Sequence, residues 1–242
     1  MTGTDIALVT GASGALGAAC AKALDAKGYR VALHYTNNED AARKLATELT
    51  NASVVVRADI GDWASVTEMG QRVTEELGAV SVLVNSGAIR RDGLMATQSA
   101  QDWAATIQVN LIGAFHVSRT VLPAMLKARW GRIINVVSPA GLIGSAGQTA
   151  YSASKAGVIG MTRSLALECG RRKVTVNALS PGFMLTDLTE GVPEEVRASF
   201  ADRTPIRRFV TPDEVAKGVE LLVDSAAITG QVLSIDGGLS IS

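Results

Sequence analysis

The sequence is short of aromatic residues, of cysteine and of net charge of either sign. Only 4% of its 242 residues are aromatic while 47% are hydrophobic. The expected core is therefore built from Ala, Val, Leu and Ile, which is typical of helices packed on a parallel sheet. Lysine plus arginine equals aspartate plus glutamate at 23 each. A nucleic-acid-binding protein would carry a basic excess, so we expect no nucleic-acid partner.

Cysteine and histidine are too sparse to form a metal site or a disulfide framework. The two cysteines, Cys20 and Cys169, and the two histidines, His34 and His116, lie far apart. We predict no metal, a reducing cytoplasm, and core positions for the cysteines. The N-terminus lacks the pattern of a signal peptide. The longest uncharged stretch, 133–154, contains a proline and three glycines, so we expect no membrane-spanning helix there.

Short apolar runs alternate with helical patterns along the whole chain. The runs that indicate buried strands are 6–9, 31–35, 54–58, 80–84, 132–137, 173–178 and 231–236. No linker, repeat or low-complexity segment divides them, so we predict one domain over 1–242. The alternation favours an α/β fold, doubly wound, with a seven-stranded parallel sheet and helices on both faces.

The helical patterns have recognisable boundaries. Helices are expected over about 18–27, from Asp62 to 77, from 100 past Asn110 towards 125, and from Tyr151 to 170. Thr211-Pro-Asp-Glu214 is a capping box that begins another. The long connection over about 182–210, in which 193–200 could form a short helix, is expected to act as a substrate lid.

A glycine-rich turn follows the first strand. Thr10-Gly-Ala-Ser-Gly-Ala-Leu-Gly17 leads into an alanine-rich helix, which is the setting of a phosphate-binding loop at a helix N-terminus. The alternative is a plain tight turn. The second strand ends at Thr36 without an acid that could bind a ribose 2′-hydroxyl. That absence favours NADP(H) over NAD(H), although no arginine beside Thr36 in the sequence marks a phosphate clamp.

Ser138, Tyr151 and Lys155 form the strongest candidate for chemistry. Lys155 follows Tyr151 by one helical turn, so the phenol and the ammonium share a helix face. A nearby cation lowers the pKa of a phenol, which predicts a proton donor and acceptor usable near neutrality. Ser138 ends the fifth strand and could bond the same substrate oxygen. Asn110, a polar residue in an apolar helix, is either functional or an ordinary satisfied amide.

These motifs, in this order and at these spacings, resemble the short-chain dehydrogenase/reductase family over essentially the whole chain. Within it the sequence is most similar to NADPH-dependent 3-oxoacyl-(acyl-carrier-protein) reductases, although polyketide and acetoacetyl-CoA reductases are also similar. The stretches that carry the closer resemblance are Leu83-Val-Asn-Ser-Gly-Ala-Ile-Arg-Arg-Asp92, Gly131-Arg-Ile-Ile-Asn, Gly147-Gln-Thr-Ala-Tyr and Thr204-Pro-Ile-Arg-Arg-Phe.

The resemblance implies a Rossmann fold and hydride transfer to a ketone, with the hydride chemistry supplied by the cofactor. Tyr151 would donate the proton, Ser138 would hold the carbonyl oxygen, Lys155 would bind the nicotinamide ribose, and Asn110 would keep a water for proton replacement. Besides Tyr151 and Lys155, the implied cofactor contacts are Gly11, Ser13, Leu16, Gly17, Thr36, Asp59, Ile60, Asn85, Gly87, Pro181, Gly182, Met184 and Thr186.

Two further expectations concern partners. The resemblance implies a homotetramer, and it implies that Arg129 and Arg172 dock an acidic acyl-carrier protein, with ordinary solvated surface charge as the alternative. Two departures from the family pattern affect the cofactor loops. Ala15 replaces a glycine and follows Gly14, where a basic residue is common, and Asn85-Ser86-Gly87-Ala88 replaces Asn-Asn-Ala-Gly. An added methyl near the pyrophosphate could clash or be absorbed by a shifted turn.

The expected function is therefore reduction of a 3-oxoacyl thioester in fatty-acid or polyketide synthesis. One alternative is a reductase or dehydrogenase of a free ketone, sugar or secondary alcohol. The other is a non-catalytic dinucleotide-binding regulator, which the presence of all four candidate catalytic residues disfavours.

Overall fold

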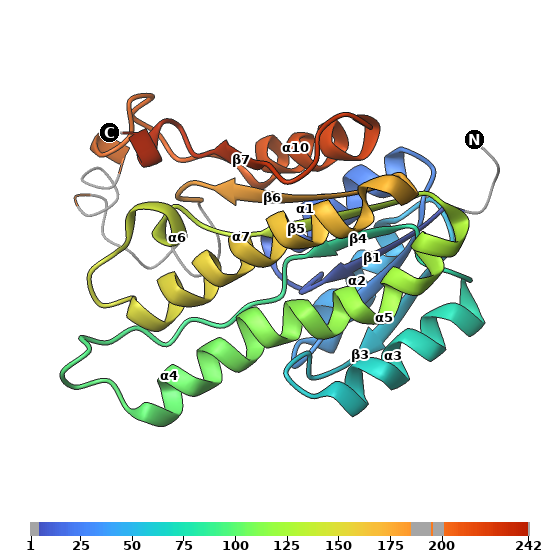
Figure 1. Cartoon of the computed structure of the whole chain (residues 1–242), viewed down its shortest axis with the longest axis horizontal. Helices are drawn as coiled ribbons and strands as arrows, with labels where there is room; N and C mark the ends of the chain where they lie inside the picture. The colour runs from blue at the N-terminus through green and yellow to red at the C-terminus, as the bar shows by residue number, and fades with distance from the viewer. Residues whose placement is uncertain (1–4, 185–194, 196–200, 242) are drawn as a thin grey trace.

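A seven-stranded parallel sheet forms the centre of the molecule, in the order β3-β2-β1-β4-β5-β6-β7. Figure 1 shows it in a computed structural model, which describes residues 5–184, 195 and 201–241. The sheet confirms the predicted α/β class. Its strands are β1 Ile6–Thr10, β2 Arg30–Tyr35, β3 Ser53–Arg57, β4 Val82–Asn85, β5 Gly131–Val136, β6 Val174–Pro181 and β7 Val232–Ile235.

Helices cover both faces of the sheet (Figure 1). Side chains alternate across β1, so Ala7 and Val9 pack in one buried cluster and Ile6 and Leu8 in the other. The first cluster lies under α1 Ala15–Ala26, α2 Glu39–Glu48 and α10 Pro212–Asp224. The second lies under α3 Trp63–Glu76, α5 Gly113–Ala128 and α7 Thr149–Cys169.

The strand order changes direction beside β1. β1 pairs with β2 on one side and with β4 on the other, while β4 continues to β5 and β6. In open parallel sheets, ligands bind in the crevice outside the carboxyl ends of the strands at such a switch point. The glycine turn after β1 and Asn85 at the end of β4 therefore flank the expected crevice.

The helix that carries Asn110 contains a π turn that the sequence did not predict. α4 Ala100–Ile107 leads into a π-helical segment, Gln108–Ile112, which continues directly into α5. By length and composition the helix 100–128 could cross a membrane. Val117, Val121 and Met125 bury its inner face against the sheet, so its apolar character is accounted for by the core of the domain.

Other boundaries differ from the sequence prediction by a few residues. α7 begins two residues before Tyr151. Lys173 adopts a positive φ of 58° and precedes β6 instead of belonging to it. A short helix, α6 Ala140–Ile143, was not predicted. The capping box at Thr211 is confirmed, because its side chain and that of Glu214 each bond the other's backbone N–H. The helix expected at 193–200 lies almost wholly outside the described residues.

Candidate active site

The glycine turn after β1 has the geometry of a phosphate-binding loop. Gly11 has a φ of +66°, and a Cβ there would lie 2.8 Å from the Gly87 Cα. A Cβ on Gly17 would overlap the Gly11 carbonyl oxygen. Gly14 is the N-cap of α1, whose first turn contains no acidic residue. Without side chains at Gly11 and Gly17, the backbone of this turn can pack closely and leave room for an anion at the N-terminus of α1. The turn therefore fits a pyrophosphate.

Ala15 fits the turn without a clash inside the protein. Ala15 is the first residue of α1 and is exposed. Gly14 has an extended conformation with φ −93°, which any residue can adopt. The two glycines that the turn requires sterically, Gly11 and Gly17, are both present. Ser13 and Leu16 lie between them, so these four predicted cofactor contacts come together in one turn.

The departure at Ser86-Gly87-Ala88 is also accommodated. The Thr10 hydroxyl accepts hydrogen bonds from Ser86 N at 3.0 Å and Gly87 N at 2.9 Å, which joins this loop to the glycine turn. A Cβ on Gly87 would lie 3.2 Å from the Ile60 Cδ1, so the glycine falls where space is smallest. The Ala88 residue lines the cavity described below.

His34 supports the glycine turn from beneath. Its Nδ1 accepts from Gly11 N at 3.1 Å, and its Nε2 lies 3.0 Å from the Ala58 carbonyl oxygen. An N–H on one side and a carbonyl on the other require the neutral tautomer protonated at Nε2. Burial, opposed by the hydrogen bond to Ala58, lowers the pKa of His34 below its usual value, which is consistent with the neutral ring.

An arginine that sequence reasoning missed lies at the predicted ribose end. β2 and β3 pair so that Tyr35 is opposite Arg57, and Arg57 Nε donates to the Thr36 carbonyl oxygen at 3.2 Å. Thr36 Oγ1 donates to Ala58 O at 3.1 Å. Because Arg57 is exposed and distant in sequence from Thr36, only the strand register reveals that a cation stands there.

Asp59 and Ile60 follow β3 at the same edge of the crevice. Asp59 Oδ1 accepts from Gly61 N at 2.8 Å, and Ile60 is buried beside Gly87 and Gly113. Asn85 ends β4, and its Nδ2 donates to Asn135 Oδ1 at 2.8 Å and to Ser118 Oγ at 3.1 Å inside the core. Its Oδ1 is buried and has no hydrogen-bond partner among the described residues.

Ser138 and Tyr151 meet at the end of β5. Both side chains line the same cavity, and Ser138 Oγ accepts from Ala140 N at 3.2 Å. Burial is the largest influence on the pKa of Tyr151 and raises it. The Ser138 hydroxyl and the charge of Arg90 lower this pKa, the charge of Asp92 raises it, and the net shift is upward. The prediction of a lowered phenol pKa is therefore wrong for this state of the chain, because burial outweighs the favourable charges.

Lys155 lies over the Tyr151 ring and is held by the backbone of β5. Its Nζ is 5.6 Å from the ring centroid and donates to Val136 O at 2.9 Å. Burial lowers the pKa of Lys155 to about 8. With a pKa of about 8, Lys155 is mostly protonated at neutral pH, and its ammonium is held by a backbone carbonyl.

The Asn110 side chain is fully used in holding a loop. Its Oδ1 accepts from Ile89 N at 2.8 Å, and its Nδ2 donates to Ile89 O at 2.9 Å and Ser154 Oγ at 3.3 Å. Ser154 Oγ in turn donates to Tyr151 O at 2.7 Å. Asn110 therefore positions the loop after β4 and the first turn of α7, and a water relay would have to use its main chain.

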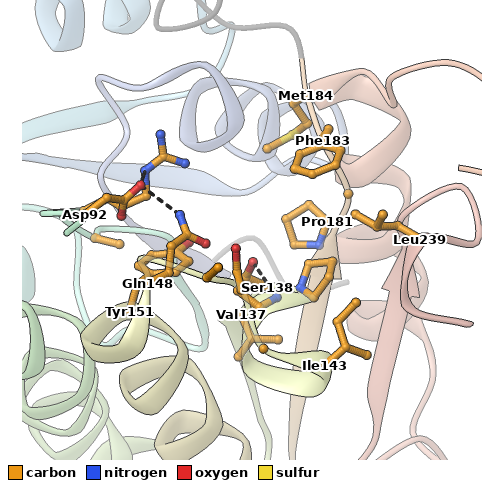
Figure 2. A pocket seen from close by; sticks show the side chains of 18 of the residues that line it. Asp92, Val137, Ser138, Ile143, Gln148, Tyr151, Pro181, Phe183, Met184 and Leu239 are labelled. Carbon is orange, nitrogen blue, oxygen red and sulfur yellow. Dashed lines mark hydrogen bonds and ion pairs between the residues drawn. The ribbon is translucent and has the colours of Figure 1, made fainter. Parts of the chain in front are cut away.

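A cavity of about 1260 Å³ opens over Ser138 and Tyr151. Figure 2 shows Asp92, Gln148 and Tyr151 on one side and Pro181, Phe183, Met184 and Leu239 on the other. Pro181, Gly182 and Met184, three of the predicted nicotinamide neighbours, thus line the same cavity as the candidate catalytic hydroxyls. A Cβ on Gly182 would lie 2.6 Å from the Asp236 Cα. Thr186 and most of the predicted lid fall outside the described residues.

Arg129 and Arg172 lie together but far from this cavity. Arg129, which follows α5, donates to the Arg171 carbonyl oxygen at 3.3 Å. Both arginines precede β5 and β6, whereas Ser138 follows β5, and six strand residues span roughly 20 Å. The structure places the two predicted docking residues at the amino end of the sheet, opposite the cavity of the same chain.

Two kinds of comparison show what the chain is similar to. A family model described as "Enoyl-(Acyl carrier protein) reductase" matches residues 11–240. The chain is 42% identical to Nodulation protein G of Azospirillum brasilense, over 97% of this chain and 98% of that protein. It is 40% identical to the 3-oxoacyl-[acyl-carrier-protein] reductase of Synechocystis (97% and 96% covered) and 40% identical to that of Thermotoga maritima (98% and 98% covered).

Proposed function

The chain belongs to the short-chain dehydrogenase/reductase family and is an NAD(P)-dependent oxidoreductase, and on this premise we propose that it reduces 3-oxoacyl thioesters to 3-hydroxyacyl thioesters with NADPH. The observation that carries the proposal is that the Ser138 and Tyr151 side chains line one cavity together with Pro181, Phe183, Met184 and Leu239. Two relatives, each 40% identical over nearly their full length, are named for this reaction on acyl-carrier protein.

The proposed mechanism assigns one task to each side chain. The nicotinamide cofactor supplies a hydride to the ketone carbon when bound. Ser138 and Tyr151 donate hydrogen bonds to the ketone oxygen, and Tyr151 gives that oxygen its proton as the C–H bond forms. The raised pKa of Tyr151 keeps the phenol protonated near neutrality, which is the form that a reduction needs. The Lys155 ammonium then stabilises the phenolate left behind.

The residues around the crevice fit a phosphorylated dinucleotide. Gly11, Gly14 and Gly17 would hold the pyrophosphate, and Thr36 with Arg57 would bind the ribose 2′-phosphate as a hydroxyl and a guanidinium. Arg57→Ala is expected to raise the KM for NADPH about tenfold or more and to leave the KM for NADH unchanged, since only NADPH carries that phosphate. Arg72→Ala, which removes an equally exposed arginine on α3, is the matched control.

We propose that the substrate is carried by acyl-carrier protein, and that the assembly is a homotetramer. Because Arg129 and Arg172 lie at the end of the sheet opposite the cavity, a carrier docked there would serve the cavity of another copy. Arg172→Glu should then raise the KM for a carrier-linked substrate and leave that for a small thioester unchanged; equal effects would reject this docking site. A cytoplasmic location is part of the proposal, and the two buried free cysteines are consistent with it.

The test measures the rate at which each of several substrates is reduced, with NADPH and with NADH, from the loss of absorbance of the reduced cofactor. Acetoacetyl-N-acetylcysteamine should be reduced with NADPH and much more slowly with NADH. Crotonyl-N-acetylcysteamine, which offers a conjugated double bond and no ketone, tests the enoyl reduction named by the family model and should be inert. Turnover of the crotonyl thioester alone, or of free ketones and sugars alone, would reject the proposed substrate class.

A further inference from the structure

A charged edge of the cavity has no part in the mechanism above. Arg90 and Asp92 line the cavity from the loop after β4, and Gln148 lines it from the segment before α7. Figure 2 shows Asp92 and Gln148 side by side. Arg90 Nε lies 3.2 Å from Asp92 Oδ2, and the Arg90 side chain is 62% exposed. Gln148 Nε2 donates to the same Asp92 oxygen at 3.0 Å. Asp92 thus orients two donors at the entrance to Ser138 and Tyr151.

The loop that carries Arg90 is held on both sides of it. Asn110 makes two hydrogen bonds to the backbone of Ile89, the preceding residue. Beyond Asp92, the Gly93 N–H donates to the Gly147 carbonyl oxygen at 2.8 Å. Although its side chain is partly exposed, Arg90 therefore projects from a fixed backbone, and the carboxylate of Asp92 restrains its guanidinium from the Nε edge.

The two sides of the cavity suit two different arms of a substrate. The side opposite Asp92 and Gln148 presents Pro181, Phe183, Met184 and Leu239 (Figure 2). The Arg203 guanidinium lies 5.7 Å from the centroid of the Phe183 ring. A ketone oxygen held by Ser138 and Tyr151 leaves two substituents on the ketone carbon. Pro181 and Met184 are predicted nicotinamide neighbours, so an acyl tail would pack on Phe183 and Leu239, and the other substituent would point to the charged edge. Arg90 and Asp92 line the same cavity as Ser138 and Tyr151, and their charges act in opposite directions on the pKa of Tyr151.

We propose that Arg90 is a specificity-determining residue that donates hydrogen bonds to the C1 oxygen of a 3-oxoacyl group. This inference rests on the proposed function. In a 3-oxoacyl group a single methylene separates the ketone from a second carbonyl, which a simple ketone lacks. A guanidinium presents a planar fork of N–H donors that suits a carbonyl or carboxylate oxygen. The C1 oxygen belongs to a thioester or to a free carboxylate, and both offer this acceptor.

The test compares substrates that possess or lack the C1 oxygen. The variants are Arg90→Ala, Arg90→Lys and Arg91→Ala, and the substrates are acetoacetyl-N-acetylcysteamine, acetoacetate and cyclohexanone. Arg91 is the matched control, because it also pairs with an aspartate, Asp102, but does not line the cavity. Arg90→Ala should lower kcat/KM for the thioester roughly 10- to 100-fold, as loss of a charged hydrogen bond does, and that for cyclohexanone by less than about twofold.

The other outcomes separate the possible explanations. Arg90→Lys should retain part of the kcat/KM for the thioester that Arg90→Ala loses. Arg91→Ala should leave kcat/KM unchanged for all three substrates. A larger loss for acetoacetate than for the thioester identifies the carboxylate as the preferred source of the C1 oxygen, and similar losses identify the neutral carbonyl. Equal losses for thioester and cyclohexanone would mean that Arg90 acts through Tyr151, and would overturn the inference, as would no loss at all. Wild-type protein that reduces cyclohexanone but neither acetoacetyl compound would instead reject the proposed function itself.

Discussion

Buried charged side chains at the two ends of the sheet differ in how fully they are hydrogen-bonded. At the amino end, Asp25 accepts hydrogen bonds from the backbone N–H of Thr50 and Asn51, each at 2.8 Å, and from the Asn51 amide at 3.0 Å. At the carboxyl end, Lys155 is equally buried but makes one hydrogen bond, to a carbonyl oxygen that bears no full charge.

Arg132 extends this contrast at the amino end. It donates to Val223 O and Gly131 O, each at 2.9 Å, and its guanidinium lies over the Trp130 ring at 4.6 Å. A charge whose bonding capacity is filled inside the protein stabilises the fold, whereas one that is left under-satisfied is available to a ligand. We therefore expect the main loss of stability from variants at the amino end and the main loss of activity from variants at the carboxyl end.

The largest effect is expected for Tyr151→Phe. Removing the phenol proton should lower kcat for the acetoacetyl thioester about 10³-fold, within the usual range for a general acid. The melting temperature should not fall, because the phenol contributes its ring to packing and its hydroxyl to the site. Steady-state kinetics and thermal unfolding on one preparation measure both. Turnover within tenfold of wild type would remove Tyr151 from the mechanism.

Asp25→Ala should produce the opposite pattern. It leaves the N–H groups of Thr50 and Asn51 without their acceptor and should lower the free energy of unfolding by about 2–4 kcal/mol, measured with urea. Asp224→Ala, which removes an exposed carboxylate paired with Lys27, is the control and should cost less than about 1 kcal/mol. Equal effects of the two substitutions would contradict the structural role of Asp25.

The Asp25 contribution should also depend on pH. Burial alone would raise the pKa of Asp25, but the hydrogen bonds from Thr50 and Asn51 outweigh burial and lower it. The stabilisation is therefore present above the unfolded-state pKa, about 3.9, and is lost as pH falls through the folded-state value. The difference in unfolding free energy between wild type and Asp25→Ala should shrink in acid, and a constant difference would rule out this titration.

Lys155→Met should stabilise the protein while lowering its activity. Burial lowers the pKa of Lys155 from 10.5 to about 8, so below pH 8 the folded state bears a cost of about 3 kcal/mol that methionine avoids. Between pH 8 and 10.5 only the unfolded state keeps the proton, and the gain should decline across that window. Lys127→Met, at an exposed lysine of α5, should show no such pH-dependent gain.

The smallest effect is expected at His34. Because the folded state favours the neutral ring, stability and NADPH affinity should fall as pH drops below the usual histidine pKa of about 6.5. His34→Gln can still accept from Gly11 and donate to Ala58, so it should bind NADPH a few-fold less tightly at most and lose the pH dependence. Fluorescence titration of NADPH across that range measures this, with His116→Gln as the control, and an unchanged pH profile would contradict it.

Most of the fold was predictable because the strands are continuous apolar runs separated by helical patterns. The order of motifs also predicted that Ser138 and Tyr151 would meet. The π turn around Asn110 was not predictable, since no residue type in Gln108–Ile112 marks a change of hydrogen-bond register. The direction of the pKa shift of Tyr151 also needed the structure, because burial of the phenol is not visible in the spacing of Tyr151 and Lys155.

Side-chain direction explains the remaining differences. Asn85 follows a buried strand at the expected place, but its amide points into the core, where it bonds Asn135 and Ser118. Arg57 was overlooked because its proximity to Thr36 depends on the pairing of β2 with β3. Arg129 and Arg172 match a docking pattern in sequence, and only the strand direction shows that they lie opposite the cavity.

The most direct test of the contrast is turnover per folded molecule for Tyr151→Phe and Asp25→Ala, measured together with acetoacetyl-N-acetylcysteamine and NADPH. The folded fraction is taken from the unfolding curve of each sample under assay conditions. We predict that Asp25→Ala matches wild type within about twofold while Tyr151→Phe loses about 10³-fold. Comparable turnover of the two variants would contradict the assignment of chemistry to the carboxyl end of the sheet.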